Sequence, residues 1–280
     1  MKKILALVLT GVMALGLLSG CSVPSDQDII NAVSAKDTTT EAATEGRTFT
    51  VGFDAEFPPY GYMDDNGEYV GFDLDLAQEV CNRLGWTLVK QPVDWDAKDM
   101  ELSSGAIDCI WNGFTIQGRE DEYTWSVPYV DNSQVFVTKT DSGIKTKADL
   151  AGRVVGVQKD SSALAALEGD SADLAATFAD MVQYADYNTA FMDLEAGASD
   201  AVAIDIGVAM YQIAQRGDGY IVLDEQLASE QYGIGFLKGN TELKDQVEKV
   251  LLEMAADGTF MKIAEKYSDF NMTDCVCLGK

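Results

Sequence analysis

The chain has 280 residues, and 47% of them are hydrophobic, so it can bury one large core or two smaller ones. Its 46 acidic residues outnumber its 20 lysines and arginines, and the net charge of −26 argues against a nucleic-acid partner, because that affinity comes from cations that neutralise phosphates. The sequence contains no histidine, which excludes Ser-His-Asp catalysis, Cys-His catalysis and histidine-ligated zinc.

Residues 1–20 have the pattern of an export signal. Lys2 and Lys3 precede an apolar run, Ile4 to Leu18, which is too short for a comfortable membrane span. The sequence from Leu18 to Cys21 (LSGC) resembles the bacterial lipobox, whose cysteine is lipidated and becomes the mature N-terminus. The resemblance implies a lipid anchor such as palmitate on Cys21, at the extracellular face of the cell membrane, or facing the periplasm if there is an outer membrane. The alternative is an ordinary secretory signal with a cysteine nearby.

Residues 21–46 are predicted to be a flexible tether. Beyond Cys21 they are rich in Ser, Thr, Ala, Asp and Glu and carry almost no large apolar side chain. Such a segment buries too little surface to offset the entropy lost on ordering. The folded part should therefore begin near Arg47.

Strand and helix patterns alternate from Arg47 to about residue 138. The expected strands are Phe49–Phe53, Thr87–Val89, Ala106–Trp111 and Ser133–Thr138. A loop from Asp54 to Tyr60 with two prolines follows the first strand, and Asp64 to Gly67 forms a hairpin-type turn. Helices are expected over Asp73–Leu84, which Gly85 ends, and from Asp94 through Leu102.

A second strand-helix series begins after a polar stretch at residues 139–143. Its expected strands are Val154–Val157, Ala201–Ile204, Ile221–Leu223 and Tyr232–Leu237. Its helices start at Ala163, with Ser161 and Ser162 as capping hydroxyls, and then cover Asn188–Ala196, Gly207–Ala214, Glu242–Ala256 and Thr259–Tyr267. The alternation predicts an α/β fold.

The cysteines are weak evidence for a metal site. Cys81 and Cys109 lie in apolar segments and are expected to be buried. Cys275 and Cys277 could form a metal or redox pair, but two ligands at a chain end are a weak case. The count allows disulfides in an exported protein, and the sequence alone does not assign them.

An internal repeat relates the two halves. Residues 100–108 (MELSSGAID) match residues 192–200 (MDLEAGASD), and an apolar strand follows each copy. A weaker pair is Val51–Phe53 (VGF) against Val155–Val157 (VGV). The repeat predicts two α/β lobes built on one plan, with a chance match as the alternative.

The strand at 106–111 ends in groups suited to a small carboxylate. Asn112-Gly113 stops the strand, and Thr115 and Arg119 follow at the carboxyl end, where open α/β sheets bind ligands. Continuing the repeat pairs Gly113 with Asp205. A cleft between the lobes would then present Arg119 and Thr115 on one wall and Asp205 on the other. This arrangement favours a zwitterionic α-amino acid.

Residues 47–270 resemble the bacterial extracellular solute-binding proteins for polar amino acids, the receptors of ABC importers, in their lipoprotein form. The resemblance rests on VGFDAEFPPYGY, EYVGFDLDLAQEV, GAIDCIWNGFTI, TWSVPY, VVGVQKDSSA, DLEAGASDAVAIDIGVA and ADGTFMKIAEKYSDF. It implies a two-lobed fold of the type II periplasmic-binding-protein kind, with mostly parallel sheets flanked by helices and a hinge of two crossovers. Mapped onto this chain, lobe 1 is 47–138 plus 232–280, and lobe 2 is 139–231.

The resemblance also implies binding roles for particular residues. Arg119 corresponds to the arginine that holds the α-carboxylate, helped by Thr115 and the backbone N–H of Ser162. Asp205 corresponds to the carboxylate that takes the α-ammonium, with the Gly113 carbonyl and the Thr115 hydroxyl as partners. The remaining expected binding residues are Asp54, Phe57 and Trp95 at the ligand side chain, together with Phe114 and Ser161. Phe57, Trp95 and Trp111 could instead be core aromatics, and Asp54 could simply cap its loop.

One position departs from the family pattern. The family arginine stands five residues after the Thr115 position, where this chain has Glu120, and Arg119 comes one residue earlier. Trp125-Ser126 is also one residue early, so a single deletion explains both shifts. The alternative is a surface arginine paired with Glu120 or Asp121.

The implied function is capture of a neutral or basic polar amino acid and its delivery to a membrane permease. Asp54, Glu56 and Asp160 disfavour an acidic side chain. We expect a monomer without cofactor, metal or enzymatic activity. The alternatives are a dehydratase or peptidoglycan-cleaving enzyme on the same scaffold, with Glu56 or Asp160 as the acid or base, and a sensor or adhesin input domain.

Overall fold

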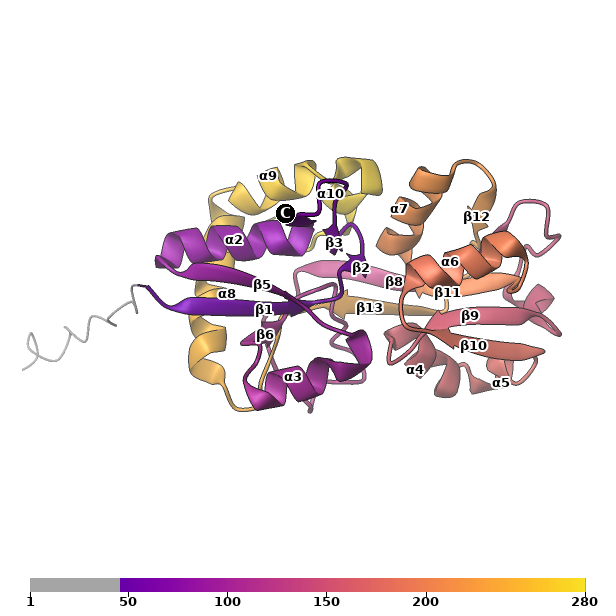
Figure 1. The fold of residues 1–280 in the computed structure, drawn as a ribbon, viewed down its shortest axis with the longest axis horizontal. Coiled ribbons are helices and arrows are strands. Elements are labelled where there is room, and N and C mark those ends of the chain that lie inside the picture. The colour runs from indigo at the N-terminus through magenta and orange to yellow at the C-terminus, as the bar shows by residue number, and fades with distance from the viewer. Residues whose placement is uncertain (1–45, 280) are drawn as a thin grey trace, which may run out of the picture. The chain divides into compact units, whose positions relative to one another are not determined.

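The computed structural model of the chain describes residues 46–279. The expected signal peptide, Cys21 and the tether as far as residue 45 lie outside this range. Within it, two sheets and their helices form two groups of elements, which we call the first and second lobe (Figure 1). None of the helices in the described range is long and apolar enough to cross a bilayer.

The first lobe is built on a five-stranded sheet. Its strands, in spatial order, are β5 (Thr87–Pro92), β1 (Thr48–Phe53), β6 (Cys109–Ile110), β14 (Gly235–Phe236) and β7 (Thr124–Trp125). Its helices are α2 (Phe72–Leu84), α3 (Lys98–Ser104), α8 (Thr241–Ala256) and α9 (Thr259–Glu265). Helices α2 and α9 lie on one side of β1 and β5, and α3 lies on the other (Figure 1). Ala77, Val80 and Cys81 of α2 are buried, and Gly85 ends the helix in the left-handed conformation, as predicted.

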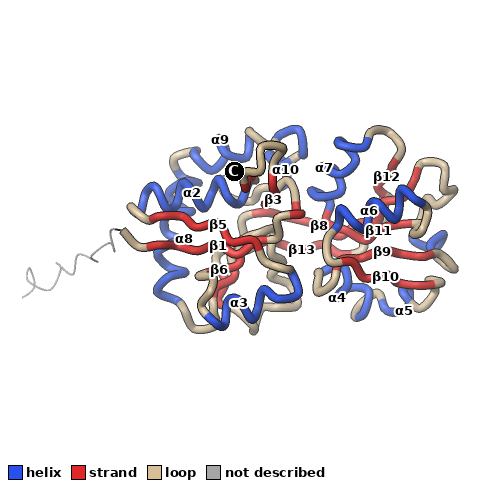
Figure 2. The backbone as a smooth tube through the Cα atoms, in the orientation of Figure 1, coloured by secondary structure: helices blue, strands red, loops and turns tan. Residues whose placement is uncertain are grey.

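The second lobe is built on a six-stranded sheet. Its strands are β10 (Asp180–Tyr184), β9 (Val154–Gln158), β11 (Ala201–Asp205), β8 (Val130–Lys139) and β12 (Tyr220–Val222), with β13 (Ala228–Tyr232) also paired to β8. Its helices are α4 (Ser162–Glu168), α5 (Ala172–Ala175), α6 (Tyr187–Ala196) and α7 (Ile206–Arg216). In Figure 2 the helices of this lobe, in blue, lie on both sides of its strands, in red.

Several short elements complete the described range. They are the small antiparallel sheet of β2 (Glu56–Phe57), β3 (Gly61–Met63) and β4 (Tyr69–Val70), the 3₁₀ turns η1 (Trp95–Ala97), η2 (Lys147–Leu150) and η3 (Ser268–Phe270), and α10 (Met272–Cys275). Cys81 and Cys109 are buried in the first lobe, as expected.

Two neighbouring strands carry the chain between the lobes. The start of β8 pairs with β13, from Val130↔Tyr232 to Gln134↔Ala228, and the rest of β8 pairs with β11 and β12. The expected lobe boundaries, after residues 138 and 231, fall near the ends of β8 and β13. The two crossovers are therefore strands that are hydrogen-bonded to each other.

The structure corrects three expected elements. The single strand at 232–237 is wrong, because the chain leaves β13 and changes sheets at Gly233 before it enters β14; a Cβ there would lie 2.9 Å from Ile116. The strand expected over 106–111 covers only Cys109–Ile110, since the N–H groups of Ala106 and Ile107 still bond to Glu101 at the end of α3. The helix expected from Asp94 begins as the turn η1.

The sheet registers confirm the internal repeat. Cys109 pairs with Val51 in the first lobe, and Ala201 pairs with Val155 in the second, as the sequence match requires. The last residue of each copy has the same contact: Asp108 Oδ2 accepts from the Thr50 N–H at 2.7 Å. Asp200 Oδ2 accepts from the Val154 N–H at 2.9 Å. Each aspartate thus ties the start of one parallel strand to its neighbour.

We expect Asp108→Ala to lower the free energy of unfolding by about 1–3 kcal/mol, because it leaves the Thr50 N–H without its charged acceptor. Asp108 also bonds Arg47 at 2.7 Å, whereas the corresponding Arg153–Asp200 pair is 3.5 Å apart and more exposed. Asp200→Ala is the matched control and should cost less. Urea denaturation measures both, and a larger loss for Asp200→Ala would contradict this reading.

Candidate functional site

A small cavity lies where strand ends of both lobes meet. Phe57, Trp95, Gly113, Thr115 and Arg119 line it from the first lobe, and Gln158, Ser161, Ser162 and Asp205 line it from the second. Its volume is about 10 Å³, no more room than one water molecule needs. The structure therefore brings eight of the ten expected binding residues to one place.

Gly113 and Thr115 form the backbone side of the first wall. Gly113 has φ +55°, and its N–H donates to the buried carboxylate of Asp73 at 2.6 Å. A Cβ at Gly113 would lie 2.9 Å from the Phe57 ring. The Thr115 hydroxyl donates to Glu230 at 2.9 Å. The positive φ and this close contact with Phe57 thus both require glycine at position 113.

Arg119 points into the site and not at its acidic neighbours. Its Nη2 donates to the carbonyl oxygen of Asp160, in the second lobe, at 3.0 Å, and its guanidinium lies 5.3 Å from the centre of the Phe114 ring. The ion pairs in residues 46–279 do not include Arg119 with Glu120 or Asp121. Phe114 does not line the cavity; it is fully buried beneath the arginine.

The second wall holds two serines and a glutamine. The Ser161 hydroxyl accepts from the Leu164 N–H at 3.1 Å and caps α4, while Ser162 exposes its hydroxyl to the cavity. Gln158 was not predicted, although it occupies the repeat position of Asp54. It donates to Asp54 at 2.7 Å and so joins the lobes. The repeat was the signal that could have found it.

Asp205 ends β11 and is buried at the base of the cavity. Its Oδ1 accepts from Asn132 at 2.8 Å, from Gln134 at 2.7 Å and from the Tyr232 hydroxyl. Burial, followed by the negative charge of Glu230, raises the pKa of Asp205 to about 8. A cation that entered the cavity would favour the ionised carboxylate.

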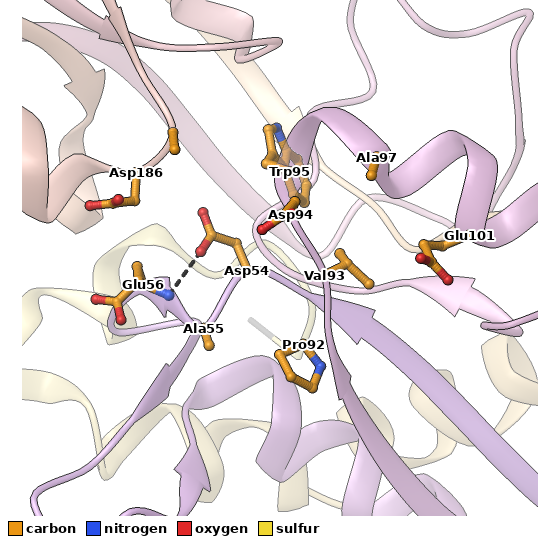
Figure 3. Close-up of a pocket in the computed structure, with 11 residues that line it drawn as sticks. Asp54, Ala55, Glu56, Pro92, Val93, Asp94, Trp95, Ala97, Glu101 and Asp186 are labelled. Atoms are coloured by element: carbon orange, nitrogen blue, oxygen red, sulfur yellow. Dashed lines mark hydrogen bonds between the residues drawn. The ribbon is translucent and has the colours of Figure 1, made fainter.

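A larger acidic pocket adjoins the cavity at Trp95, which lines both. Its volume is about 470 Å³. Five carboxylates line it, and the lining contains no lysine or arginine: Asp54, Glu56, Asp94, Glu101 and Asp186. Figure 3 shows the first three near Asp186, with Glu101 farther along α3. Asp54 thus lies in this pocket and not in the small cavity, and burial raises its pKa to about 6.

Further contacts hold the lobes together around the site. Lys98 is only 1% exposed, yet its Nζ bonds the carboxylate of Asp160 across the lobes. Asn188 donates to Glu56 in the same way. Trp111, undecided from the sequence, is a core residue that is fully buried and packs against Tyr129.

Comparisons with known proteins agree with this architecture. The family model for bacterial extracellular solute-binding proteins, family 3, matches residues 49–270. The L-cystine-binding protein TcyJ of Escherichia coli is 31% identical over 270 residues, which cover 95% of this chain and 96% of that protein. The fold is that of type II periplasmic amino-acid-binding proteins, as expected. The expectation of mostly parallel sheets is wrong, because β14 and β8 pair antiparallel with their neighbours.

Two solved structures are also similar. One is an ABC uptake transporter substrate-binding protein from Streptococcus pneumoniae with bound histidine, at TM-score 0.76 and 36% identity over 79% of this chain and 92% of that one. The other is an ancestral amino-acid-binding protein, a precursor of cyclohexadienyl dehydratase, at TM-score 0.72 and 30% identity over 79% and 95%.

We expect Gly113→Ala to destabilise the protein by about 1–3 kcal/mol, because the new Cβ meets Phe57 in addition to the strain of a positive φ. Gly118→Ala is the matched control: Gly118 has φ +80°, and a Cβ there would meet nothing within 4 Å. Thermal and urea unfolding measure both variants. Equal losses would show that the close packing at Gly113 contributes nothing.

Proposed function

The chain belongs to the family 3 bacterial extracellular solute-binding proteins, and from that premise we propose that it captures one polar amino acid between its lobes and delivers it to the permease of an ABC importer. The observation that carries the proposal is the pairing of opposite charges across one cavity. Arg119 lies on the first wall, and the buried Asp205 lies on the second. An α-amino acid presents the complementary pair of charges.

The carboxylate end of the ligand belongs at Arg119. In the structure, this guanidinium bonds a neutral carbonyl, and a carboxylate would be a stronger, bidentate partner. The hydroxyls of Thr115 and Ser162 lie within 3.2 Å of each other in the same cavity and can donate to the carboxylate. The ammonium end belongs at Asp205, which is buried without an ion pair among the described residues.

Capture requires the lobes to separate. A cavity of about 10 Å³ does not admit an amino acid, since ligand pockets typically enclose roughly 300–1,000 Å³. The paired strands β8 and β13 are the connection about which the lobes can turn. An amino acid that bonds both walls stabilises the closed form through contacts that the open form lacks.

The acidic pocket suits a neutral or basic ligand side chain and favours a basic one. The pocket shares Trp95 with the cavity, so a side chain that passes this ring reaches Asp54 and its neighbours. A distal cation would be attracted by five carboxylates, whereas an acidic side chain would be repelled. These charges leave aspartate and glutamate as the least suitable ligands.

Anchoring and domain limits complete the proposal. The LSGC sequence supports a signal peptide over 1–20 and a lipid on Cys21, with the protein held at the outer face of the membrane by its tether. We propose 47–138 plus 232–280 and 139–231 as the limits of the two lobes, with the crossover strands β8 and β13 paired in the sheet of the second lobe. The enzyme alternative needs an available carboxylate as its acid or base. Neither Asp160 nor Glu56 is available, because Lys98 bonds Asp160 and Asn188 donates to Glu56.

A thermal-shift screen of the twenty amino acids, cystine and ornithine tests the function. We expect the unfolding temperature to rise with at least one neutral or basic amino acid. No shift with any of them would contradict the receptor function. Stabilisation by aspartate or glutamate alone would overturn the argument from the acidic pocket.

Arg119→Ala tests the carboxylate contact. We expect it to weaken binding of the best amino acid from the screen about 10- to 100-fold, because a charged hydrogen bond contributes about 1.5–3 kcal/mol. Arg153→Ala is the control, since Arg153 pairs with Asp200 and does not line the cavity. Calorimetry gives both affinities, and wild-type affinity in Arg119→Ala would rule out this role.

A further inference from the structure

Two carboxylates, and not one, lie at the base of the cavity. Asp205 is 3% exposed and Glu230 is 7% exposed. Asn132 Nδ2 donates to Asp205 Oδ1 at 2.8 Å and to Glu230 Oε1 at 2.6 Å. Gln134 Nε2 donates to the same two oxygens, at 2.7 and 2.8 Å. Because they share two donors, the carboxylate oxygens must be close neighbours.

The strand register places them together. In the sheet, β8 lies between β11 and β13, with Gln134 opposite Asp205 and Asn132 opposite Glu230. Residues two apart on a strand face the same side, so both amides and both carboxylates point the same way. The juxtaposition is therefore part of the sheet, and Glu230 belongs to the same site as Asp205.

The surroundings do not supply a bonded cation for the pair. Tyr232, Thr115 and Ser162 direct hydroxyls at it. Burial raises the pKa values of Tyr60 and Tyr187, and the charge of Asp205 is a further cause in both. Asp54 adds a further negative charge near Tyr187. Arg119 lines the same cavity but bonds Asp160. In residues 46–279, neither Asp205 nor Glu230 forms an ion pair within 4 Å.

Two adjacent, buried anions repel each other strongly, and such pairs retain one proton between them. We propose that Asp205 and Glu230 share one proton when no amino acid is bound, and that the α-ammonium of the ligand replaces this proton, which leaves to solvent. The inference rests on the proposed function and adds Glu230 to the ammonium site. The charge balances, because one positive charge enters as one proton departs.

The exchange gives binding a pH dependence of defined sign. The ligand binds the doubly ionised pair, and acid conditions keep the proton in place. Affinity should therefore rise by up to about ten-fold per pH unit while the pair is protonated, and level off once it is ionised. Burial and the nearby charge of Glu230 raise the pKa of Asp205, which places this rise above the usual titration range of a carboxylate.

Calorimetry with L-arginine and L-glutamine tests the exchange, because neither side chain titrates between pH 6 and 8. We expect the full-length folded chain to release close to one proton per ligand at pH 6, seen as a binding enthalpy that differs between phosphate and Bis-Tris buffers. Affinity should rise from pH 6 to pH 7.5. If the observed binding enthalpy is the same in both buffers and the affinity does not change with pH, the proton exchange is wrong and the receptor function stays intact. If neither amino acid binds at any of these pH values and none stabilises the protein in the screen, both proposals fail.

Glu230→Gln assigns the effect to the pair. The variant keeps the size of the side chain and removes one charge, so proton release should fall and the pH profile should flatten. Glu225→Gln is the control: Glu225 precedes β13, accepts from the Lys147 N–H and lies outside the cavity. It should keep the wild-type profile, and an unchanged profile in Glu230→Gln would exclude Glu230 from the exchange.

A measurement without ligand gives an independent check. Glu230→Gln should raise the unfolding temperature relative to wild type more at pH 8.5, where the pair is ionised, than at pH 5.5, where it holds the proton. The same shift at both pH values would contradict a shared proton.

Discussion

The pairing of β8 with β13 is the constraint on which the rest of the structure depends. Each strand leaves one lobe and enters the other, and five consecutive residue pairs hold them in register. The same ribbon carries Asn132 and Gln134 on one strand and Glu230 and Tyr232 on the other, all of which contact the base of the cavity. The connection between the lobes and the floor of the site are thus one piece of sheet.

The groups that would bind the two ends of an amino acid already have hydrogen-bond partners within the protein. The Asp160 carbonyl occupies Arg119, and hydroxyl and amide groups surround Asp205. Asp160 has φ +54°, which is uncommon outside glycine, and this turn lets its carbonyl reach Arg119 while its carboxylate reaches Lys98. Two cations of the first lobe therefore meet one residue of the second.

The sequence predicted most of what local patterns determine. The end of α2 at Gly85, the capping Ser161 and the end of β11 beside Asp205 follow from short-range rules, and the internal repeat predicted Asp205 across a cleft from Arg119. What was missed depends on long-range pairing. The residues next to Glu230 in the sequence form no recognisable binding pattern. Only its pairing with Asn132 on β8 brings it to Asp205. The break between β13 and β14 was missed for the same reason, since two different sheets determine where each strand pairs.

The location of the ammonium site on the crossover ribbon has a mechanical consequence. When two lobes rotate about β8 and β13, each atom moves in proportion to its distance from that axis. Residues on the two crossover strands therefore move least. The acidic pocket is built from the loops after β1 and β5 and the start of α6, which lie off these two strands. The backbone groups of a bound amino acid would thus lie near the rotation axis. Its side chain would lie farther from that axis, where a small rotation changes the distance between the two walls most.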